Sequence, residues 1–565
     1  MLRAAPRQDL YLRQFHPNGL AGARPRPRSR EASRSSMQSS YDYIVVGSGS
    51  SGSVVAARLS EDPSCTVLLL EAGGSDKSLK VVMPALGQST MYGDPSFDWR
   101  VTAEPDWTRV GQKDYMPKGK LLGGTSSINA MCFLRGSAED FDAWAALGNR
   151  GWDYASVLPY FRRLETYEVG ESQARGASGP QPVGALRSRH PMSDIFVKAC
   201  VNHGAPFLDD VNGGSYEGVG FAQVSQRRGQ RFSAARSFLW PASKRPNLRI
   251  QLNSLAQRVL FEGRKAVGVE VIRNNRPESV LARKGIVLSS GVFGTPQILM
   301  LSGIGPAEML RQHGIDVLID APGVGQNLQD HAGTRHVAWV DIKTFNMIRG
   351  PFQKLMAGLE WLVYGTGPAS SPMTQAVLAK KLDSGDDRSR FSVLFTPGGY
   401  ELHAGGTRFL DKPAVTAIIN VHRPHSSGHV ELRSSDCRDQ LKIQPNLFGD
   451  ERDVATLMKG HRAIREVFDT EPLRSHVLGE YRPGVAIRSD DELGAYIKET
   501  AKGIFHTAGT ARMGSVVDDR LRVNGVAGLF VADASVMPFV VSSNLNATCM
   551  MIGERLAEWL ASGAR

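Results

Sequence analysis

The sequence predicts an α/β protein whose first domain is built on a doubly wound parallel sheet. Residues 43–46 form a short apolar run typical of buried strands, and a glycine-rich turn follows at residues 47–52. Residues 54–59 then place apolar side chains on one helical face, and a second apolar run covers residues 66–70. Strand, turn, helix and strand in this order begin a βαβ unit, from which parallel sheets are built.

The glycine-rich turn has the spacing of a dinucleotide-binding turn. Gly47 permits the tight turn, Gly49 lets the backbone approach a pyrophosphate, and Gly52 lets the helix pack closely on the strand. The helix that begins here offers free N–H groups to phosphates. The predicted pyrophosphate contacts are Gly47, Gly49, Ser50, Ser51 and Gly52.

Glu71 indicates which dinucleotide binds. This acid ends the second predicted strand, 24 residues after Gly47, where a carboxylate can bind the two hydroxyls of a ribose. Such a turn serves both NAD and FAD. Residues 68–74 read Leu-Leu-Leu-Glu-Ala-Gly-Gly, a wording typical of flavoproteins, which favours FAD.

The composition limits the class of protein. A chain of 565 residues that is 41% hydrophobic and 22% charged is large enough for two domains, and it is not disordered, collagen-like or coiled-coil. No apolar run is long enough to predict a membrane-spanning helix. The five cysteines form no Cys-x-x-Cys pair, so we expect neither a disulfide framework nor a metal site.

The formal net charge of +11 is concentrated near the N-terminus. Residues 1–40 carry eight arginines against Asp9 and Glu31, a net +6, so the remainder carries only +5 and we expect no nucleic-acid partner. We expect this basic, serine-rich extension to be disordered. It is either a mitochondrial transit peptide or an artefact of translation that starts at Met37, and in the second case we expect a cytoplasmic protein, free or associated with a membrane surface.

Four further segments resemble signatures of the glucose-methanol-choline (GMC) oxidoreductase family. Residues 119–129 read Gly-Lys-Leu-Leu-Gly-Gly-Thr-Ser-Ser-Ile-Asn, and residues 291–305 end in Leu-Ser-Gly-Ile-Gly. Residues 505–514 read Phe-His-Thr-Ala-Gly-Thr-Ala-Arg-Met-Gly. Residues 544–548 read Asn-Leu-Asn-Ala-Thr, and this motif is most similar to that of choline dehydrogenase-like members and of primary alcohol dehydrogenases and oxidases.

The resemblance extends from Tyr41 to about Leu560 and implies two interleaved domains, α+β overall. The first is a Rossmann-like FAD-binding domain, for which we assign residues 41–165, 235–330 and 500–565. The second is a substrate domain built on an antiparallel sheet, for which we assign residues 166–234 and 331–499.

The resemblance also implies further contacts with FAD. They are Leu121, Thr125, Asn129, Ala130, Met131, Cys132, Val259, Asp533 and Ala534. Some family members attach the flavin to a histidine a few residues before the 119–129 segment. The aligned residue is Met116, and no histidine occurs between Met83 and Arg163, so we expect non-covalent FAD.

Alcohol oxidation needs a base for the hydroxyl proton and a donor that holds the oxygen. The resemblance implies that His506 is the base and Asn546 its partner, while hydride passes from the carbinol carbon to the flavin N5. A photodecarboxylase branch of the family lacks this histidine. A light-driven or non-catalytic flavoprotein is therefore the alternative of another class, which His506 disfavours.

Gly333 favours a neutral primary alcohol over choline. Choline-oxidising members carry a glutamate at this position, two residues after His331, and its carboxylate neutralises the quaternary ammonium. Choline dehydrogenase activity is the near alternative.

We expect a dehydrogenase in preference to an oxidase, with a quinone, another carrier or oxygen as electron acceptor, and a homodimer is one option for assembly. Residues 352–364 predict an amphipathic helix that packs in the core.

Overall fold

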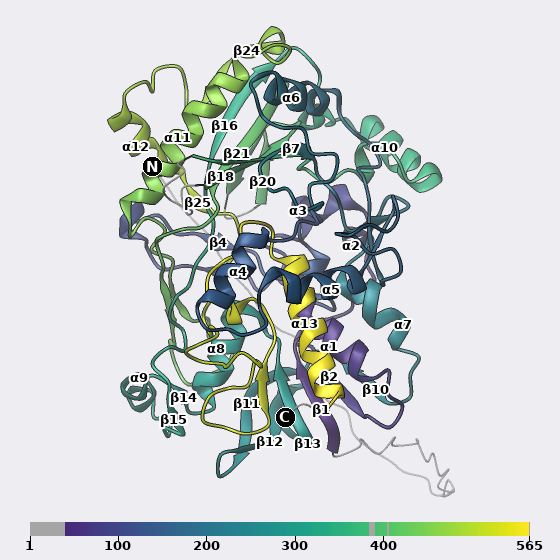
Figure 1. The fold of residues 1–565 in the computed structure, drawn as a ribbon, viewed down its shortest axis with the longest axis vertical. Helices are drawn as coiled ribbons and strands as arrows, with labels where there is room; N and C mark the ends of the chain where they lie inside the picture. The colour runs from purple at the N-terminus through teal and green to yellow at the C-terminus, as the bar shows by residue number, and fades with distance from the viewer. Residues whose placement is uncertain (1–39, 383–389, 404–405, 564–565) are drawn as a thin grey trace, which may run out of the picture. The chain divides into compact units, whose positions relative to one another are not determined.

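The computed structural model describes residues 40–382, 390–403 and 406–563, and the expected α/β architecture is confirmed (Figure 1). The N-terminal extension and its predicted disorder lie outside the described residues. Two seven-stranded sheets form the framework, and the chain passes back and forth between them, so that each sheet is built from separate segments.

The first sheet contains the predicted βαβ unit. Its strand order is β10-β2-β1-β13-β12-β11, with β26 paired to β13. The parallel strands are β1 (Ser40–Val46), β2 (Val67–Leu70), β10 (Leu248–Gln251), β13 (Arg276–Leu288) and β26 (Leu529–Val531). Strands β11 (Leu255–Glu262) and β12 (Lys265–Arg273) extend the sheet in the antiparallel sense.

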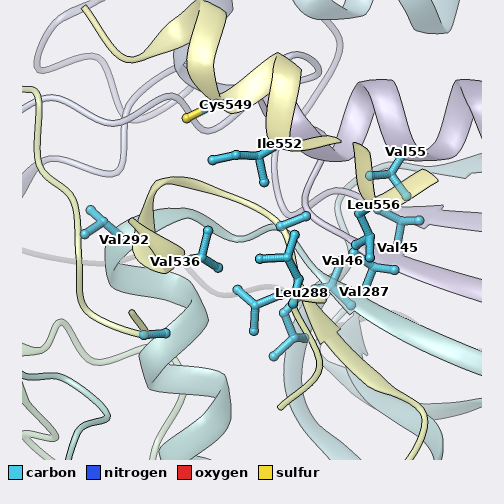
Figure 2. Close-up of a cluster of buried hydrophobic side chains, with 14 of the residues drawn as sticks. Val45, Val46, Val55, Val287, Leu288, Val292, Val536, Cys549, Ile552 and Leu556 are labelled. Carbon is cyan, nitrogen blue, oxygen red and sulfur yellow. The ribbon is translucent and has the colours of Figure 1, made fainter. Parts of the chain in front are cut away.

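Helices α1 (Ser50–Leu59) and α13 (Asn546–Ala561) pack together beside the first sheet, although nearly the whole chain separates them in sequence. In Figure 2, Val45 and Val46 of β1, Val287 and Leu288 of β13, and Ile552 and Leu556 of α13 fill one continuous core. All six of these side chains are at most 3% exposed. This packing places the N-terminal ends of both helices beside the glycine turn that follows β1.

The second sheet is antiparallel throughout, with the order β24-β16-β21-β18-β17-β7 and with β25 paired to β16. Its strands are β7 (Gly218–Phe221), β16 (Ala332–Val340), β17 (Ala376–Lys381), β18 (Arg390–Thr396), β21 (Ala414–Val421), β24 (Val477–Arg482) and β25 (Lys502–Gly503). Helices α6 (Pro191–Asn202), α11 (Glu451–Phe468) and α12 (Asp490–Thr500) share its core. The domain boundaries stay a prediction, and β25, which we assigned to the first domain, pairs with the second sheet.

The remaining elements include short helices and two-stranded pairs outside these two sheets. The helices are α2 (Leu79–Val82), α3 (Pro84–Met91), α4 (Ala138–Ala146), α5 (Tyr154–Leu164), α7 (Trp240–Ala242), α8 (Gly291–Leu301) and α9 (Ala307–Gln312). The two-stranded pairs are β3 (Val101–Thr102) with β4 (Tyr115–Met116), β5 (Glu165–Tyr167) with β6 (Gln181–Val183), β8 (Gln226–Arg227) with β9 (Gln230–Arg231), β14 (Ile304–Gly305) with β15 (Ile319–Asp320), β19 (Tyr400–His403) with β20 (Gly406–Phe409), and β22 (His429–Glu431) with β23 (Lys442–Gln444). Among the described residues, no helix is long and apolar enough to cross a membrane.

The predicted helix at residues 352–364 forms as α10 (Pro351–Tyr364), but its expected burial in the core is wrong. Only Trp361 is buried, and its indole N–H donates to the Gly229 carbonyl. The rest of its surface carries exposed apolar side chains, among them Phe352 and Leu362, each 71% exposed. Amphipathic spacing predicted the helix correctly, but it could not tell which face meets the protein.

Replacing Gly52 by alanine tests the packing of α1 on the glycine turn. An added Cβ would lie 2.0 Å from the Gly47 carbonyl oxygen, so we expect the Gly52→Ala variant to lose about 1–3 kcal/mol of unfolding free energy. Gly358→Ala on α10 is the matched control, because an added Cβ meets nothing within 4 Å there. Thermal unfolding checks both variants, and an equal midpoint for Gly52→Ala and wild type would contradict this packing.

Candidate active site

A cavity of about 400 Å³ lies where the two sheets meet. Val46 at the end of β1 and Leu70 at the end of β2 line it from the first sheet. From the second sheet, Arg335 of β16, Leu394 of β18 and Ile418 of β21 line it. The carboxyl ends of parallel strands are the usual ligand-binding edge of such sheets.

Most of the residues predicted from the sequence line this one cavity. They are Gly47, Gly49, Ser50, Ser51, Glu71, Thr125, Asn129, Ala130, Met131, Cys132, His506, Asp533, Ala534 and Asn546. Gly52, Leu121 and Val259 are not among the lining residues. Gly52 packs against the turn, Leu121 is fully buried beside Val81 and Ile128, and the Val259 N–H donates to Ser302 Oγ at 2.8 Å.

The glycine turn has the shape of a pyrophosphate cradle. Gly47 has φ +96°, and a Cβ there would lie 2.4 Å from the Ser289 carbonyl oxygen, so only glycine fits without strain. At Gly49 the nearest atom to an added Cβ is 4.0 Å away, which leaves the backbone open to a ligand. Gly49 is the N-cap of α1 and supplies no side-chain cap. The N-terminus of α1 therefore presents backbone donors to the cavity, where they fit the phosphates of FAD.

Glu71 connects the turn to the second strand. Its carboxylate accepts hydrogen bonds from Ser48 Oγ at 2.6 Å and from the Gly73 N–H at 2.7 Å. Burial raises the pKa of Glu71, and these hydrogen bonds oppose that rise. Because two carboxylate oxygens offer about four acceptor positions, the side chain can hold the loop and still accept a ribose hydroxyl.

The hydrogen bonds around His506 fix its tautomer. His331 Nε2 lies 3.0 Å from the Val541 carbonyl, which can only accept, so Nε2 carries the hydrogen. Burial lowers the pKa of His331 to about 4, so its Nδ1 is unprotonated at neutral pH. That atom lies 2.9 Å from His506 Nδ1, which must therefore be the donor. The lone pair of His506 is left on Nε2.

Asn544, not Asn546, is the hydrogen-bond partner of His506. Asn544 Nδ2 lies 2.9 Å from His506 Nε2 and donates to it. Asn546 begins α13, and its Oδ1 accepts from Ser50 Oγ at 2.6 Å. This differs from our expectation because two asparagines occur two positions apart at residues 544–546, and their order alone does not say which faces the histidine. Burial lowers the pKa of His506 well below its usual value, with nearby His331 and Lys118 adding to the effect, so the imidazole is neutral.

Three further residues near His506 were not predicted as site residues. Asp330 Oδ1 accepts the backbone N–H of His506 at 2.8 Å, and burial raises the pKa of Asp330 to about 7. Lys118 Nζ donates to the Phe505 carbonyl at 3.1 Å and so holds the same segment from the other side. His331 makes the contact already described. Lys118 directly precedes the 119–129 segment that resembles the family, and His331 lies two residues before Gly333, so these positions were the available signal.

Burial of neutral histidines makes stability fall in acid. The pKa of His336, which lies outside the cavity against Phe468, is lowered by burial to about 4. Between pH 6.5 and 4 the unfolded chain binds more protons at this residue, so the unfolding free energy falls as pH falls through that window. We expect His336→Gln to remove up to about 3 kcal/mol of this pH dependence. Denaturant unfolding at pH 7 and pH 4.5 checks it, with His429→Gln on the surface as control, and an unchanged pH dependence in His336→Gln would contradict it.

A dinucleotide turn and a neutral histidine that face one cavity define a dinucleotide-dependent oxidoreductase. The family model described as GMC oxidoreductase matches residues 41–333 in its N-terminal part and residues 424–553 in its C-terminal part. The chain therefore belongs to the GMC oxidoreductase family of FAD flavoproteins, which act on CH–OH donors, and the resemblance seen in the sequence is confirmed.

Individual relatives span nearly the whole chain. Human mitochondrial choline dehydrogenase (Homo sapiens) is 38% identical over 94% of this chain and 91% of its own length. Oxygen-dependent choline dehydrogenase of Brucella anthropi is 36% identical over 92% of this chain and 95% of its own length. The solved structure of pyridoxine 4-oxidase from Mesorbium loti is 29% identical, with a TM-score of 0.82, over 92% of this chain and 98% of that one. The chain is similar to enzymes with different alcohol substrates.

Proposed function

We propose that this protein oxidises a primary alcohol other than choline to the aldehyde, with FAD held non-covalently. The observation that carries the proposal is the unprotonated Nε2 of His506, which lies beside Asn544 in the cavity that also holds the glycine turn. When bound, FAD supplies the hydride acceptor at N5.

The protein's own residues take the proton and orient the alcohol. When the alcohol binds, its hydroxyl replaces the hydrogen bond from Asn544 at His506 Nε2, and this nitrogen accepts the hydroxyl proton. Asn544 then donates to the alcohol oxygen as negative charge develops on it. Asn546 holds the N-terminus of α1 through Ser50 and lines the same cavity as the glycine turn. The residues at 47–51, Glu71, 125, 129–132 and 533–534 are the proposed FAD contacts. Leu121, Gly52 and Val259 support the FAD site from behind the cavity wall.

Non-covalent attachment rests on the residues before the 119–129 segment. Met116, the residue aligned with the covalent histidine of some family members, is a buried part of β4. A thioether is not a nucleophile that joins a flavin as an imidazole does. Denaturation with acid should therefore release all of the FAD into solution.

Choline is the near alternative because both curated relatives above are choline dehydrogenases. Two features oppose it. An added Cβ at Gly333 would lie 2.6 Å from Ile504 Cγ2, so the apolar Ile504 occupies the space of a carboxylate side chain. The guanidinium of Arg335 lines the same cavity and would repel a quaternary ammonium. The expectation of a neutral alcohol considered Gly333 alone, and the proposal below replaces it with an alcohol that carries a negative charge, because of Arg335.

The electron acceptor and the location are also proposals. We favour a quinone or another carrier over oxygen, and thus a dehydrogenase. The name of the human relative includes the word mitochondrial, which supports a transit peptide at residues 1–36.

Anaerobic mixing of the purified holoprotein with alcohols tests the proposal. We expect primary alcohols to bleach the visible flavin absorption and choline to leave it unchanged. Recovery of the absorption on adding a quinone or dye, but not air, identifies a dehydrogenase. Bleaching by choline alone would contradict the substrate assignment, and no bleaching by any alcohol would favour a non-catalytic or light-driven flavoprotein.

A further inference from the structure

We propose that the alcohol carries a carboxylate, and that Arg335 on β16 binds this carboxylate at the end of the cavity remote from His506. The inference rests on the proposed function, because it names the substrate class of the same site. Arg335 lines the cavity together with Ile418 and Leu394, its neighbours in the register of the second sheet.

Arg335 is half-buried in the cavity wall and has no carboxylate partner, unlike the buried Arg109 and Arg175. Arg109 pairs with Asp106 and Asp114, and Arg175 pairs with Glu165 and Asp210. Among the described residues, no aspartate or glutamate lies within ion-pair distance of Arg335, and its buried Nε atom has no hydrogen-bond partner.

The surroundings of Arg335 do not supply a negative charge either. Its guanidinium lies 5.9 Å from the centre of the Tyr400 ring, and Lys502 is a second cation close enough to affect its electrostatics. The Asp114 carboxylate near Lys502 is already paired with Arg109. A partly buried charge without a counter-ion is costly, and a bound anion would remove that cost.

The guanidinium is suited to a carboxylate. Its planar N–H fork binds the two carboxylate oxygens together, and the same positive charge disfavours cations. The nearby lining residues Met373, Leu394, Ile418 and Ile504 are apolar and fit a hydrocarbon or aromatic spacer.

The strand geometry sets the distance between the two ends of the substrate. His331, which contacts His506, precedes β16, and Arg335 lies four residues further along, a rise of about 13 Å. The arginine side chain spans part of this distance. The carboxylate and the reacting hydroxyl are therefore separated by several carbons, as in a terminally hydroxylated fatty acid or a hydroxymethyl benzoate, and not adjacent as in a 2-hydroxy acid.

The first experiment compares matched alcohols on the full-length holoprotein. The probes are 6-hydroxyhexanoate against its methyl ester, and 4-(hydroxymethyl)benzoate against its methyl ester, with the rate and saturation of anaerobic flavin bleaching as readouts. We expect the acids to be preferred over the esters. Arg335→Gln should weaken the apparent affinity for the acids by roughly 30-fold or more and leave the esters nearly unchanged. Arg335→Lys should restore part of the affinity, and Arg482→Gln on neighbouring β24, whose side chain is 47% exposed, is the control.

A second experiment does not depend on turnover. Hexanoate and hexanamide lack the reacting hydroxyl, and their binding is followed by the change that they cause in the flavin spectrum. We expect hexanoate to bind wild type more tightly than hexanamide does and to lose this advantage in Arg335→Gln. Equal binding of hexanoate and hexanamide to wild type would overturn the inference, and so would an equal loss of affinity for acids and esters in Arg335→Gln. If the esters still bleached the flavin, the proposed function would stand. Bleaching by no alcohol, with hexanoate still bound through Arg335, would contradict the proposed function alone.

Discussion

Replacing His506 by alanine is expected to lower kcat/KM for alcohol oxidation by about 10³-fold while the FAD content stays at the wild-type level. The imidazole is neutral, and the hydrogen bonds of His331 place its lone pair on Nε2, beside Asn544. Alanine leaves no group at this position to take the hydroxyl proton. Steady-state kinetics with a dye acceptor and the ratio of flavin to protein absorbance measure the two quantities.

A matched histidine variant distinguishes loss of the catalytic base from a general effect of removing a histidine side chain. His429→Ala removes a side chain that is 41% exposed and lies on β22, and it should leave both quantities unchanged. A His506→Ala protein with FAD bound and with activity within a few-fold of wild type would mean that another group takes the proton.

Asn544→Ala is expected to lower kcat by about 10²–10³-fold, and Asn546→Ala to lower it much less. The amide of Asn544 donates to His506 Nε2 in the structure, and it can donate to the alcohol oxygen instead once the hydroxyl occupies that lone pair. Asn546 instead accepts from Ser50 Oγ at the start of α1. Its loss should weaken FAD retention before it slows turnover.

The two asparagine variants control each other, since they remove the same amide two residues apart. Turnover at saturating alcohol and FAD loss on dilution are measured for both. The opposite order, with Asn546→Ala the slower enzyme and Asn544→Ala close to wild type, would restore the pairing that we expected from the sequence and would contradict the geometry described above.

The glycine turn and the helix that follows it were predictable from the sequence because neighbouring residues determine their backbone conformation. A strand, a turn with Gly47 at positive φ and a helix N-terminus lie within about fifteen residues, so their spacing identifies them. The resemblance then placed His506 and Asn129 in one cavity although the chain between them is long.

Contacts between residues far apart in the sequence were not predictable in the same way. Which of Asn544 and Asn546 meets His506 depends on how α13 docks against α1, and the exposure of the apolar face of α10 depends on what packs against Trp361. Arg335 gave no signal at all in the sequence, since an arginine on an alternating strand is usually a solvated surface residue. Only the structure shows that this charge lines the cavity without a carboxylate partner.

The central claim, that His506 assists hydride transfer from an alcohol to the flavin, is tested most directly by anaerobic stopped-flow reduction with protiated and α,α-dideuterated forms of one primary alcohol. The account predicts complete bleaching with one aldehyde formed per flavin, a slower rate with the deuterated alcohol, and a much slower rate in His506→Ala. Bleaching that is insensitive to deuterium and unchanged in His506→Ala, or flavin that no alcohol reduces, would contradict it.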